Sequence, residues 1–273
     1  MTSLAFIGGG NMAGALIGGL IARGTAPSSI RALEIDPDRR RQLEAQYGIG
    51  TLAAPDASLR TADTVILAVK PQQLRQVCAG LRPHLDAPLV LSIAAGIRAA
   101  DIARWLDQPR VVRAMPNTPA LIGMGISGVA ALPAAGVDDR RRAQLLLEAA
   151  GPVVWLDDEA LLDPVTAVSG SGPAYVFYFI EAMQRAGSEL GLTPAQAREL
   201  AIATFRGAAE LAARSDESLA TLRERVTSKG GTTAAALARM QADRLDDGIV
   251  AAVRAASERA TELGDEFGRD SAA

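Results

Sequence analysis

The residues best suited to chemistry begin directly after the first apolar run of the chain. There, Gly8-Gly9-Gly10-Asn11-Met12-Ala13 matches the pattern G-x-G-x-x-A and follows the predicted strand Leu4–Ile7. In this pattern the first glycine permits a tight turn, the second lets the backbone approach a pyrophosphate, and the small third residue lets the next helix pack on the strand. The free N–H groups at the start of that helix favour a phosphate. The segment therefore predicts a dinucleotide-binding loop made by Gly8, Gly9, Gly10, Asn11, Met12 and Ala13.

Two carboxylates and three arginines stand at the end of the second predicted strand, Ile30–Ile35. Glu34 and Asp36 occupy the place where a carboxylate accepts a hydrogen bond from the ribose 2′-hydroxyl of NAD. The arginines that follow, residues 39–41, could instead hold the additional phosphate of NADP, or could simply be the solvated start of a helix. The choice between NADH and NADPH therefore stays open at this point.

Three further segments stand at the ends of predicted strands: Ala68–Pro71, Ser92–Gly96 and Arg113–Pro119. Ligands of an open parallel sheet lie beyond the carboxyl ends of its strands, so these segments should border the same cleft. Their small residues leave room for a nicotinamide ring, and the prolines that bracket the last segment hold its amide side chain rigidly. We expect cofactor contacts from Ala68, Val69, Lys70, Pro71, Ala94, Ala95, Gly96 and Asn117.

The apolar pattern predicts the elements that must position these residues. Short apolar runs alternate with helical stretches, which indicates βαβ units and a parallel sheet. The predicted strands are Leu4–Ile7, Ile30–Ile35, Thr64–Val69, Leu89–Ser92, Val111–Ala114, Ile126–Ala131 and Val153–Leu156. Residues 1–160 should thus form an α/β Rossmann-type, doubly wound domain.

After Leu156 the β-branched runs vanish and the residues read as helices separated by glycine. One helix is predicted at Pro173–Leu190, and the next opens with the capping box Thr193–Gln196 and runs to about Ala213. A last helix is predicted from Arg244 to Leu263, where Gly264 should end it. Residues 161–273 are therefore expected to form an all-α C-terminal domain.

Composition excludes several classes of function. The chain of 273 residues has a formal net charge of −3, so no basic field is available for nucleic acid or an anionic membrane surface. No apolar run approaches the roughly 20 residues that span a bilayer, and no secretory signal precedes Leu4, so we expect a cytoplasmic protein. A single cysteine, Cys78, and a single histidine, His84, argue against disulfides, a metal site and Ser–His chemistry.

The second predicted domain contains a glycine turn rich in hydroxyl groups. The segment Val226–Leu237 reads V-T-S-K-G-G-T-T-A-A-A-L, in which the glycines feed a helix whose first N–H groups are free. Flanked by hydroxyls, such a turn fits a small carboxylate. Taken alone, it is equally compatible with an ordinary capped helix start.

These motifs together resemble those of the pyrroline-5-carboxylate reductase family, over residues 5 to 240. The matching segments are I-G-G-G-N-M at the first glycines, V-K-P at Val69–Pro71, Arg113–Pro119, Ser169–Ala174 and Val226–Leu237. The resemblance implies an enzyme that reduces the cyclic imine Δ1-pyrroline-5-carboxylate to proline with NADPH or NADH, the last step of proline biosynthesis. Many family members carry a short polar residue where this chain has Glu34-Ile35-Asp36, which argues against the family's usual NADPH preference here.

The resemblance also implies roles at the glycine turn. The substrate carboxylate would rest on Ser228, Gly230, Gly231, Thr232 and Thr233, with Thr233 nearest the ring nitrogen and therefore the catalytic candidate. It further implies a homodimer interleaved through the C-terminal helices, sometimes assembled into a homodecamer. The active site would lie between the Rossmann domain of one chain and helices of that dimer.

Two other functions fit the sequence less well. A β-hydroxyacid dehydrogenase of similar plan presents a catalytic lysine on the first long helix of its second domain, and Pro173–Leu190 contains no lysine. A regulator or scaffold that binds a cofactor would need no hydroxyl-rich carboxylate site, so the intact segment Ser228–Thr233 argues against it.

Overall fold

The computed structural model describes residues 3–268. Contacts divide them into two compact units. The first comprises the described residues up to Ser171 together with those from Ala255 onward, and the second is Gly172–Arg254. The expected domain border between residues 160 and 161 lies before the border of these units, and the end of the last helix belongs to the first unit.

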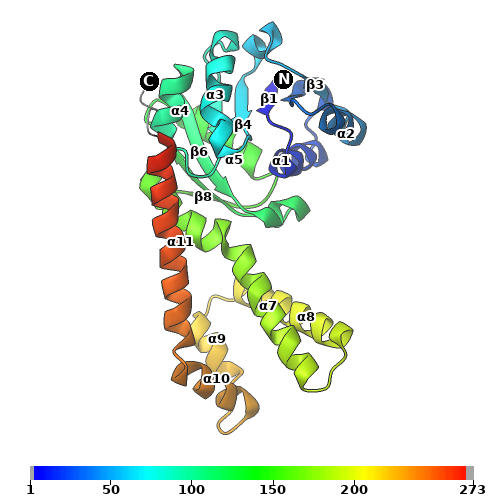
Figure 1. The fold of residues 1–273 in the computed structure, drawn as a ribbon, viewed down its shortest axis with the longest axis vertical. Coiled ribbons are helices and arrows are strands. Elements are labelled where there is room, and N and C mark those ends of the chain that lie inside the picture. Colours follow the sequence, from blue (N-terminus) through cyan, green and yellow to red (C-terminus); the bar gives the residue numbers. More distant parts are fainter. Residues whose placement is uncertain (1–2, 269–273) are drawn as a thin grey trace. The chain divides into compact units, whose positions relative to one another are not determined.

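The first unit is a sheet with helices on both faces (Figure 1). Its strands are β1 (Leu4–Ile7), β2 (Ile30–Leu33), β3 (Gly50–Leu52), β4 (Thr64–Leu67), β5 (Leu89–Ser92), β6 (Val111–Pro116), β7 (Ser127–Ala131) and β8 (Val153–Trp155). Its helices are α1 (Asn11–Ala22), α2 (Pro37–Tyr47), α3 (Pro71–Leu81), α4 (Ala99–Leu106), α5 (Val137–Leu147) and α6 (Leu162–Val165). A π-helical turn, Thr166–Gly170, follows α6.

Within the described residues the strands form one sheet in the order β3-β2-β1-β4-β5-β6-β7-β8. The doubly wound α/β class predicted from the sequence is confirmed, but two details were wrong. Strand β7 runs antiparallel to β6, because the connection, residues 117–126, contains only a 3-10 turn and a parallel return needs a longer crossover. Strand β3 was not predicted, since Gly50-Thr51-Leu52 is too short to show a pattern.

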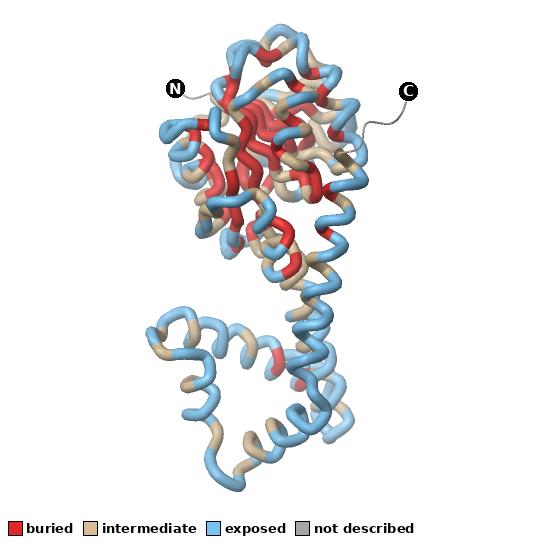
Figure 2. Tube along the Cα trace, turned by 90° about the vertical axis from the view of Figure 1, so that its left-hand side faces the viewer, coloured by how far each residue is buried: buried red, intermediate tan, exposed pale blue. Residues whose placement is uncertain are grey.

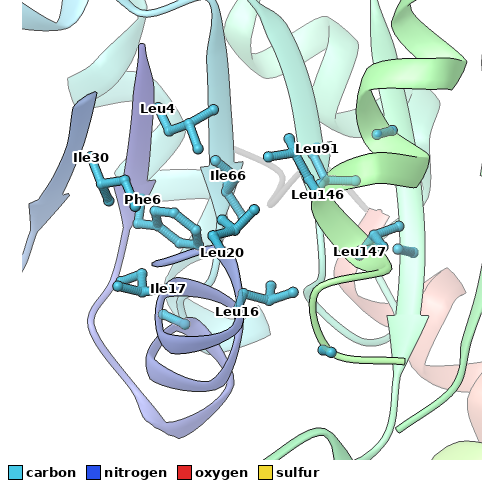
Figure 3. Packing of buried hydrophobic residues seen from close by; sticks show 14 of the residues in the cluster. Leu4, Phe6, Leu16, Ile17, Leu20, Ile30, Ile66, Leu91, Leu146 and Leu147 are labelled. Carbon is cyan, nitrogen blue, oxygen red and sulfur yellow. The ribbon is translucent and has the colours of Figure 1, made fainter. Parts of the chain in front are cut away.

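The alternation of side chains along β1 explains the layers. Leu4 and Phe6 belong to one buried cluster, which includes Leu16, Ile17 and Leu20 of α1 (Figure 3). Ala5 and Ile7 point to the other face and pack with α3 and α4. Because both faces are covered, all four residues of β1 are buried, as is typical of a parallel strand.

The second unit consists of helices alone. They are α7 (Gly172–Glu189), α8 (Pro194–Ala213), α9 (Leu219–Arg225), α10 (Thr232–Ala242) and the first part of α11 (Leu245–Gly268). The predicted capping box is present, with Thr193 and Gln196 bonded reciprocally at the start of α8. Helices α7 and α8 approach closely, since a Cβ atom on Gly187 would lie 3.0 Å from the Cβ of Ala197.

Much of this unit is exposed (Figure 2). None of the described residues of α7, α9 or α10 is buried. Large apolar side chains are uncovered, among them Phe177, Tyr178 and Leu211. Exposed apolar surface of this extent is typical of a face that contacts another protein.

The predicted end of the last helix at Gly264 was wrong, because α11 continues to Gly268. Gly264 is buried inside the helix, and a Cβ atom there would lie 2.7 Å from Nη2 of Arg98. This glycine serves a close approach between segments and not a helix stop. In the part of the chain that the structure describes, no helix is long and apolar enough to cross a membrane.

Candidate functional site

The glycine-rich loop lies where the strand order reverses, between β1 and β4. Gly8 follows β1 with φ +97° and donates its N–H to the carbonyl of Leu33 at 2.8 Å. A Cβ atom on Gly8 would lie 2.8 Å from the carbonyl oxygen of Ala68, which follows β4. Both the left-handed backbone and the close approach require glycine at this position. A crevice at such a switch point is where open α/β sheets bind ligands.

A cavity of about 570 Å³, the main cleft, opens at this point. Seven of the predicted cofactor residues line it: Gly8, Gly9, Gly10, Glu34, Ala68, Val69 and Lys70. Its size is within the range of small-molecule and cofactor sites. The structure therefore brings together the glycine loop, the carboxylate after β2 and the segment after β4.

The neighbouring glycines have different physical roles. A Cβ atom on Gly9 would lie 2.6 Å from Leu43 and 3.2 Å from Oε2 of Glu34, so Gly9 is required for packing on α2. A Cβ atom on Gly10 would meet nothing within 4 Å, so a side chain there would point into open space. Gly10 is also the N-cap of α1 without a side-chain cap, which leaves the first N–H groups of α1 available to a ligand.

Met12 and Ala13 do not line the main cleft. Ala13 is fully buried in the core, and Met12 packs against the same cluster. Their role in the structure is the close packing of α1 on the sheet, which the small residue in the pattern permits.

The carboxylate of Glu34 is fixed beneath the glycine loop. It accepts hydrogen bonds from the N–H of Gly9 at 2.8 Å and from that of Asp36 at 3.0 Å. Glu34 lines both the main cleft and a smaller cavity of about 380 Å³ beside it. Asp36 also lines this smaller cavity, but its Oδ1 accepts from the N–H of Asp38 as the N-cap of α2. Of the two carboxylates, Glu34 faces both spaces.

Part of the lining was not foreseen from the sequence. Ala53, Ala54 and Pro55 line the main cleft because they follow β3, the strand whose pattern was too short to recognise. Gln73 and Gln76 also line the main cleft, and they lie on α3. The signal that could have found these two is their spacing of three residues, which places side chains on one face of a helix.

The segment after β5 packs against the last turns of α11. Gly96 has φ +72°, and a Cβ atom there would lie 3.3 Å from the Cβ of Leu263 and 3.4 Å from the ring of Phe267. Ala94 is buried in the core. Ala94, Ala95 and Gly96 do not line the main cleft.

Asn117 is held by both ends of its amide. Its Oδ1 accepts from the N–H of Ile126 at 3.0 Å, and its Nδ2 donates to Oγ of Ser169 at 3.3 Å. Ser169 belongs to the π-helical turn, and π-helical segments are frequent at functional sites. The sequence did not link these two residues, which are 52 positions apart.

In the second unit the predicted glycine turn leads directly into α10. Gly230 has φ +73°, and Gly231 is the N-cap of α10 without a side-chain cap. A Cβ atom on Gly231 would lie 2.5 Å from Oγ of Ser228, so this hydroxyl lies over the start of the helix. The first N–H groups of α10, including those of Thr232 and Thr233, have no partner within the helix. Donors of this kind suit a carboxylate.

The single cysteine and histidine lie outside these features. Cys78 is completely buried in the core, and burial raises the pKa of its thiol to about 12. His84 is half-buried in a 3-10 turn, Arg82–His84. Neither lines the main cleft.

Comparisons with known proteins agree with this arrangement. Residues 159–263 match the family model for pyrroline-5-carboxylate reductase dimerisation, and residues 3–96 match a model described as NADP oxidoreductase, coenzyme F420-dependent. A pyrroline-5-carboxylate reductase of Pseudomonas aeruginosa is 45% identical over 268 residues, which cover 97% of this chain and 98% of that protein.

Solved structures are similar over nearly the whole chain. A pyrroline-5-carboxylate reductase of Coxiella burnetii superposes with a TM-score of 0.91 at 38% identity, covering 96% of this chain and 98% of that one. The Plasmodium falciparum pyrroline carboxylate reductase with NADP bound gives a TM-score of 0.86 at 26% identity, with the same coverage. With its fold, its glycine loop and these relatives, the chain belongs to the pyrroline-5-carboxylate reductase family.

Proposed function

We propose that this protein reduces Δ1-pyrroline-5-carboxylate to proline with NADH or NADPH as the hydride donor. The observation that carries the proposal is the main cleft, where Gly8–Gly10, Glu34 and Ala68–Lys70 meet at the switch point of the sheet in a chain of this family.

The residues of the main cleft fit a dinucleotide. Gly10 leaves open space where a Cβ would stand, and the uncapped start of α1 offers N–H groups to a pyrophosphate. When bound, the nicotinamide supplies the hydride from its C4 carbon. Ala68–Pro71, Ala94–Gly96 and Asn117 border the ring in this proposal. Because Ser169 and Ile126 fix the amide of Asn117, its orientation is set before the ring arrives.

The start of α10 holds the substrate in the same proposal. The amides of Gly231, Thr232 and Thr233 bind the carboxylate, and the hydroxyls of Ser228 and Thr233 flank it. An imine nitrogen can be protonated from water before binding, so the protein needs no strong acid. Thr233 orients the ring nitrogen through a hydrogen bond, and the protein contributes to the rate mainly by holding the reactants in place.

In this proposal Glu34 determines whether the protein uses NADH or NADPH. Two backbone N–H groups hold its carboxylate where the adenosine ribose would lie, as an acceptor for a 2′-hydroxyl. A 2′-phosphate would meet this negative charge at close range. NADH is therefore used at least as well as NADPH.

The test is the consumption of reduced cofactor by the purified protein. Adding Δ1-pyrroline-5-carboxylate is expected to oxidise NADH and NADPH and to produce proline in equal amount, whereas a β-hydroxyacid with oxidised cofactor gives no turnover. Turnover of the hydroxyacid alone would replace this function by that of a dehydrogenase. A preference for NADPH above about 100-fold in kcat/KM, roughly 2.7 kcal/mol, would contradict the role of Glu34.

We further propose a cytoplasmic homodimer that can assemble into a homodecamer. Its residues 1–160 serve the cofactor, and its residues 161–273 serve the substrate and assembly. The dimerisation model matched at 159–263 and the uncovered apolar side chains of α7 support self-association. Light scattering is expected to give the mass of two or more chains at micromolar concentration, and a stable monomer would contradict the assembly.

A further inference from the structure

We infer that Arg39 is a positioning residue that holds the glycine loop, and that it is not a ligand of the 2′-phosphate of NADP. This inference rests on the proposed function, since it concerns how the same cleft binds its cofactor. From the sequence alone, the arginines of residues 39–41 could be ligands of this phosphate or simply the solvated start of a helix.

The guanidinium of Arg39 is directed at the backbone of the glycine loop. Its Nε donates to the carbonyl of Gly9 at 2.5 Å, and its Nη2 lies 3.5 Å from that of Gly10. Its third nitrogen, Nη1, donates to Oε1 of Gln42 at 3.0 Å. Every nitrogen of this guanidinium therefore has a partner within the protein.

The peptide groups of Gly9 are held from two directions. The carboxylate of Glu34 accepts from its N–H at 2.8 Å, while Arg39 donates to its carbonyl. Glycine has more conformational freedom to lose than any other residue, so a loop of three glycines is costly to order. Two charged side chains that fix the loop in advance reduce the part of that cost that falls on cofactor binding.

Gly14 of α1, the helix that begins directly after the glycine loop, leaves space for Arg39. A Cβ atom on Gly14 of α1 would lie 3.2 Å from Nη2 of Arg39. The side chain is thus packed between α2 and the start of α1, and it is half-buried. To bind a phosphate, this side chain would have to give up its hydrogen bonds to Gly9 and Gln42.

The charges around the smaller cavity also oppose a phosphate. Its lining includes the carboxylates of Glu34, Asp36 and Asp38 but a single guanidinium, that of Arg39. The other two arginines have partners as well: Nη1 of Arg40 donates to the carbonyls of Glu34 and Ile35, and Arg41 pairs with Asp38. Among the residues that line the smaller cavity, carboxylates outnumber guanidinium groups, and a 2′-phosphate placed there would face Glu34 and Asp36.

The two roles predict different cofactor profiles. The glycine loop contacts the pyrophosphate, which NADH and NADPH share, so loss of a loop support weakens both equally. Loss of a phosphate ligand weakens NADPH alone. The ratio of the two dissociation constants therefore separates the roles, because effects common to both cofactors cancel in it.

The experiment compares Arg39→Ala, Arg39→Lys and the control Arg41→Ala, which removes the same charge from the same helix. Fluorescence titration is expected to show both Kd values raised about tenfold in Arg39→Ala, with their ratio within about threefold of the wild-type ratio and kcat changed less than twofold. Lysine keeps the charge but lacks the fork that reaches two carbonyls, so Arg39→Lys recovers only part of the loss. Arg41→Ala is expected to leave both Kd values within about twofold of wild type. A loss of NADPH affinity at least tenfold greater than that of NADH in Arg39→Ala would overturn the inference.

A second comparison uses Glu34→Gln, which removes the negative charge. It is expected to shift the Kd ratio toward NADPH by the same factor with and without Arg39→Ala, since Arg39 does not take up the phosphate. A shift that disappears in the double variant would assign the phosphate to Arg39. Thermal unfolding of each variant identifies folding defects, and if Arg39→Ala does not fold, the ratio in Arg39→Lys decides.

The result is separable from the proposed function. If the protein binds both cofactors but does not reduce Δ1-pyrroline-5-carboxylate, the proposed reaction fails and the ratio still decides the role of Arg39. If it binds neither cofactor, both fail.

Discussion

The guanidinium of Arg98 lies against the backbone of Gly264, where a side chain on this residue would begin. A Cβ atom there would be 2.7 Å from Nη2 and 2.8 Å from Cζ of Arg98. Arg98 cannot easily move aside, because both of its terminal nitrogens bond the carboxylate of Asp163, at 3.0 and 2.8 Å. The hydroxyl of Thr261, one turn before Gly264, donates to the same carboxylate at 3.0 Å. These contacts attach the last turns of α11 to the segment that follows β5.

Gly264→Ala is therefore expected to destabilise the protein by about 1–3 kcal/mol, as overpacking at a close contact does. The matched control is Gly248→Ala in the same helix, where a Cβ would meet nothing within 4 Å. That change is expected to be neutral or to stabilise by up to about 1 kcal/mol, since alanine favours helix. Thermal unfolding midpoints measure both. Equal effects of the two substitutions would show that Arg98 yields to the added methyl group.

Gly10 and Gly8 should respond differently to a side chain. Gly10→Val is expected to abolish NADH binding while the fold persists, because its side chain would occupy the open space of the cleft. Gly10→Ala should weaken binding less. Gly8→Ala is expected to lower stability as well, because of its φ of +97° and the close carbonyl of Ala68, by about 1–3 kcal/mol. Fluorescence titration and thermal unfolding test the three variants. Unchanged affinity in Gly10→Val would mean that the loop is only a structural turn.

Thr233→Ala is expected to reduce kcat/KM for the imine by about 10- to 100-fold, the loss of one well-placed hydrogen bond worth roughly 1.5–3 kcal/mol. Thr233→Ser keeps the hydroxyl and should retain most activity. Affinity for NADH should barely change in either variant. Thermal unfolding must accompany the kinetics, because Thr233 lies in the first turn of α10. Full activity in a folded Thr233→Ala protein would leave the carboxylate site to backbone amides alone.

The ion pair between Arg110 and Asp139 should make stability sensitive to acid. The Asp139 carboxylate accepts from Nε of Arg110 at 2.9 Å, and this hydrogen bond holds its pKa below the ordinary value despite burial. A group with a lowered folded pKa stabilises the protein above its unfolded pKa, about 3.9 for aspartate, and this contribution is lost as the pH falls through the folded pKa.

Asp139→Asn is accordingly expected to cost about 1–2 kcal/mol at pH 7, with a smaller difference from wild type below about pH 3. The adjacent Asp138→Asn serves as the control, because Asp138 is exposed on the same helix turn. Denaturant unfolding at the two pH values measures the differences. If the wild-type advantage over Asp139→Asn is the same at both, the pair does not account for acid sensitivity.

Several features were predictable because their cause lies within a few neighbouring residues. The strand Leu4–Ile7, the turn at Gly8 and the capping box at Thr193 each depend on local backbone preference and short-range hydrogen bonds. The end of the second strand likewise placed Glu34 at the cleft. Where the local pattern was too short, as at Gly50–Leu52, both the strand and the lining residues after it were missed.

The strand-turn-helix unit, the doubly wound class and the family to which the motifs point could therefore be predicted from patterns of neighbouring residues. The contacts of Gly264, Arg39 and Asn117 could not, because they depend on the assembled fold. Each of these residues acts through a partner far away in the sequence: Arg98, the carbonyl of Gly9 and Ser169. No local preference encodes such a pairing, because the two groups meet only after the sheet has assembled and brought their segments within bonding distance.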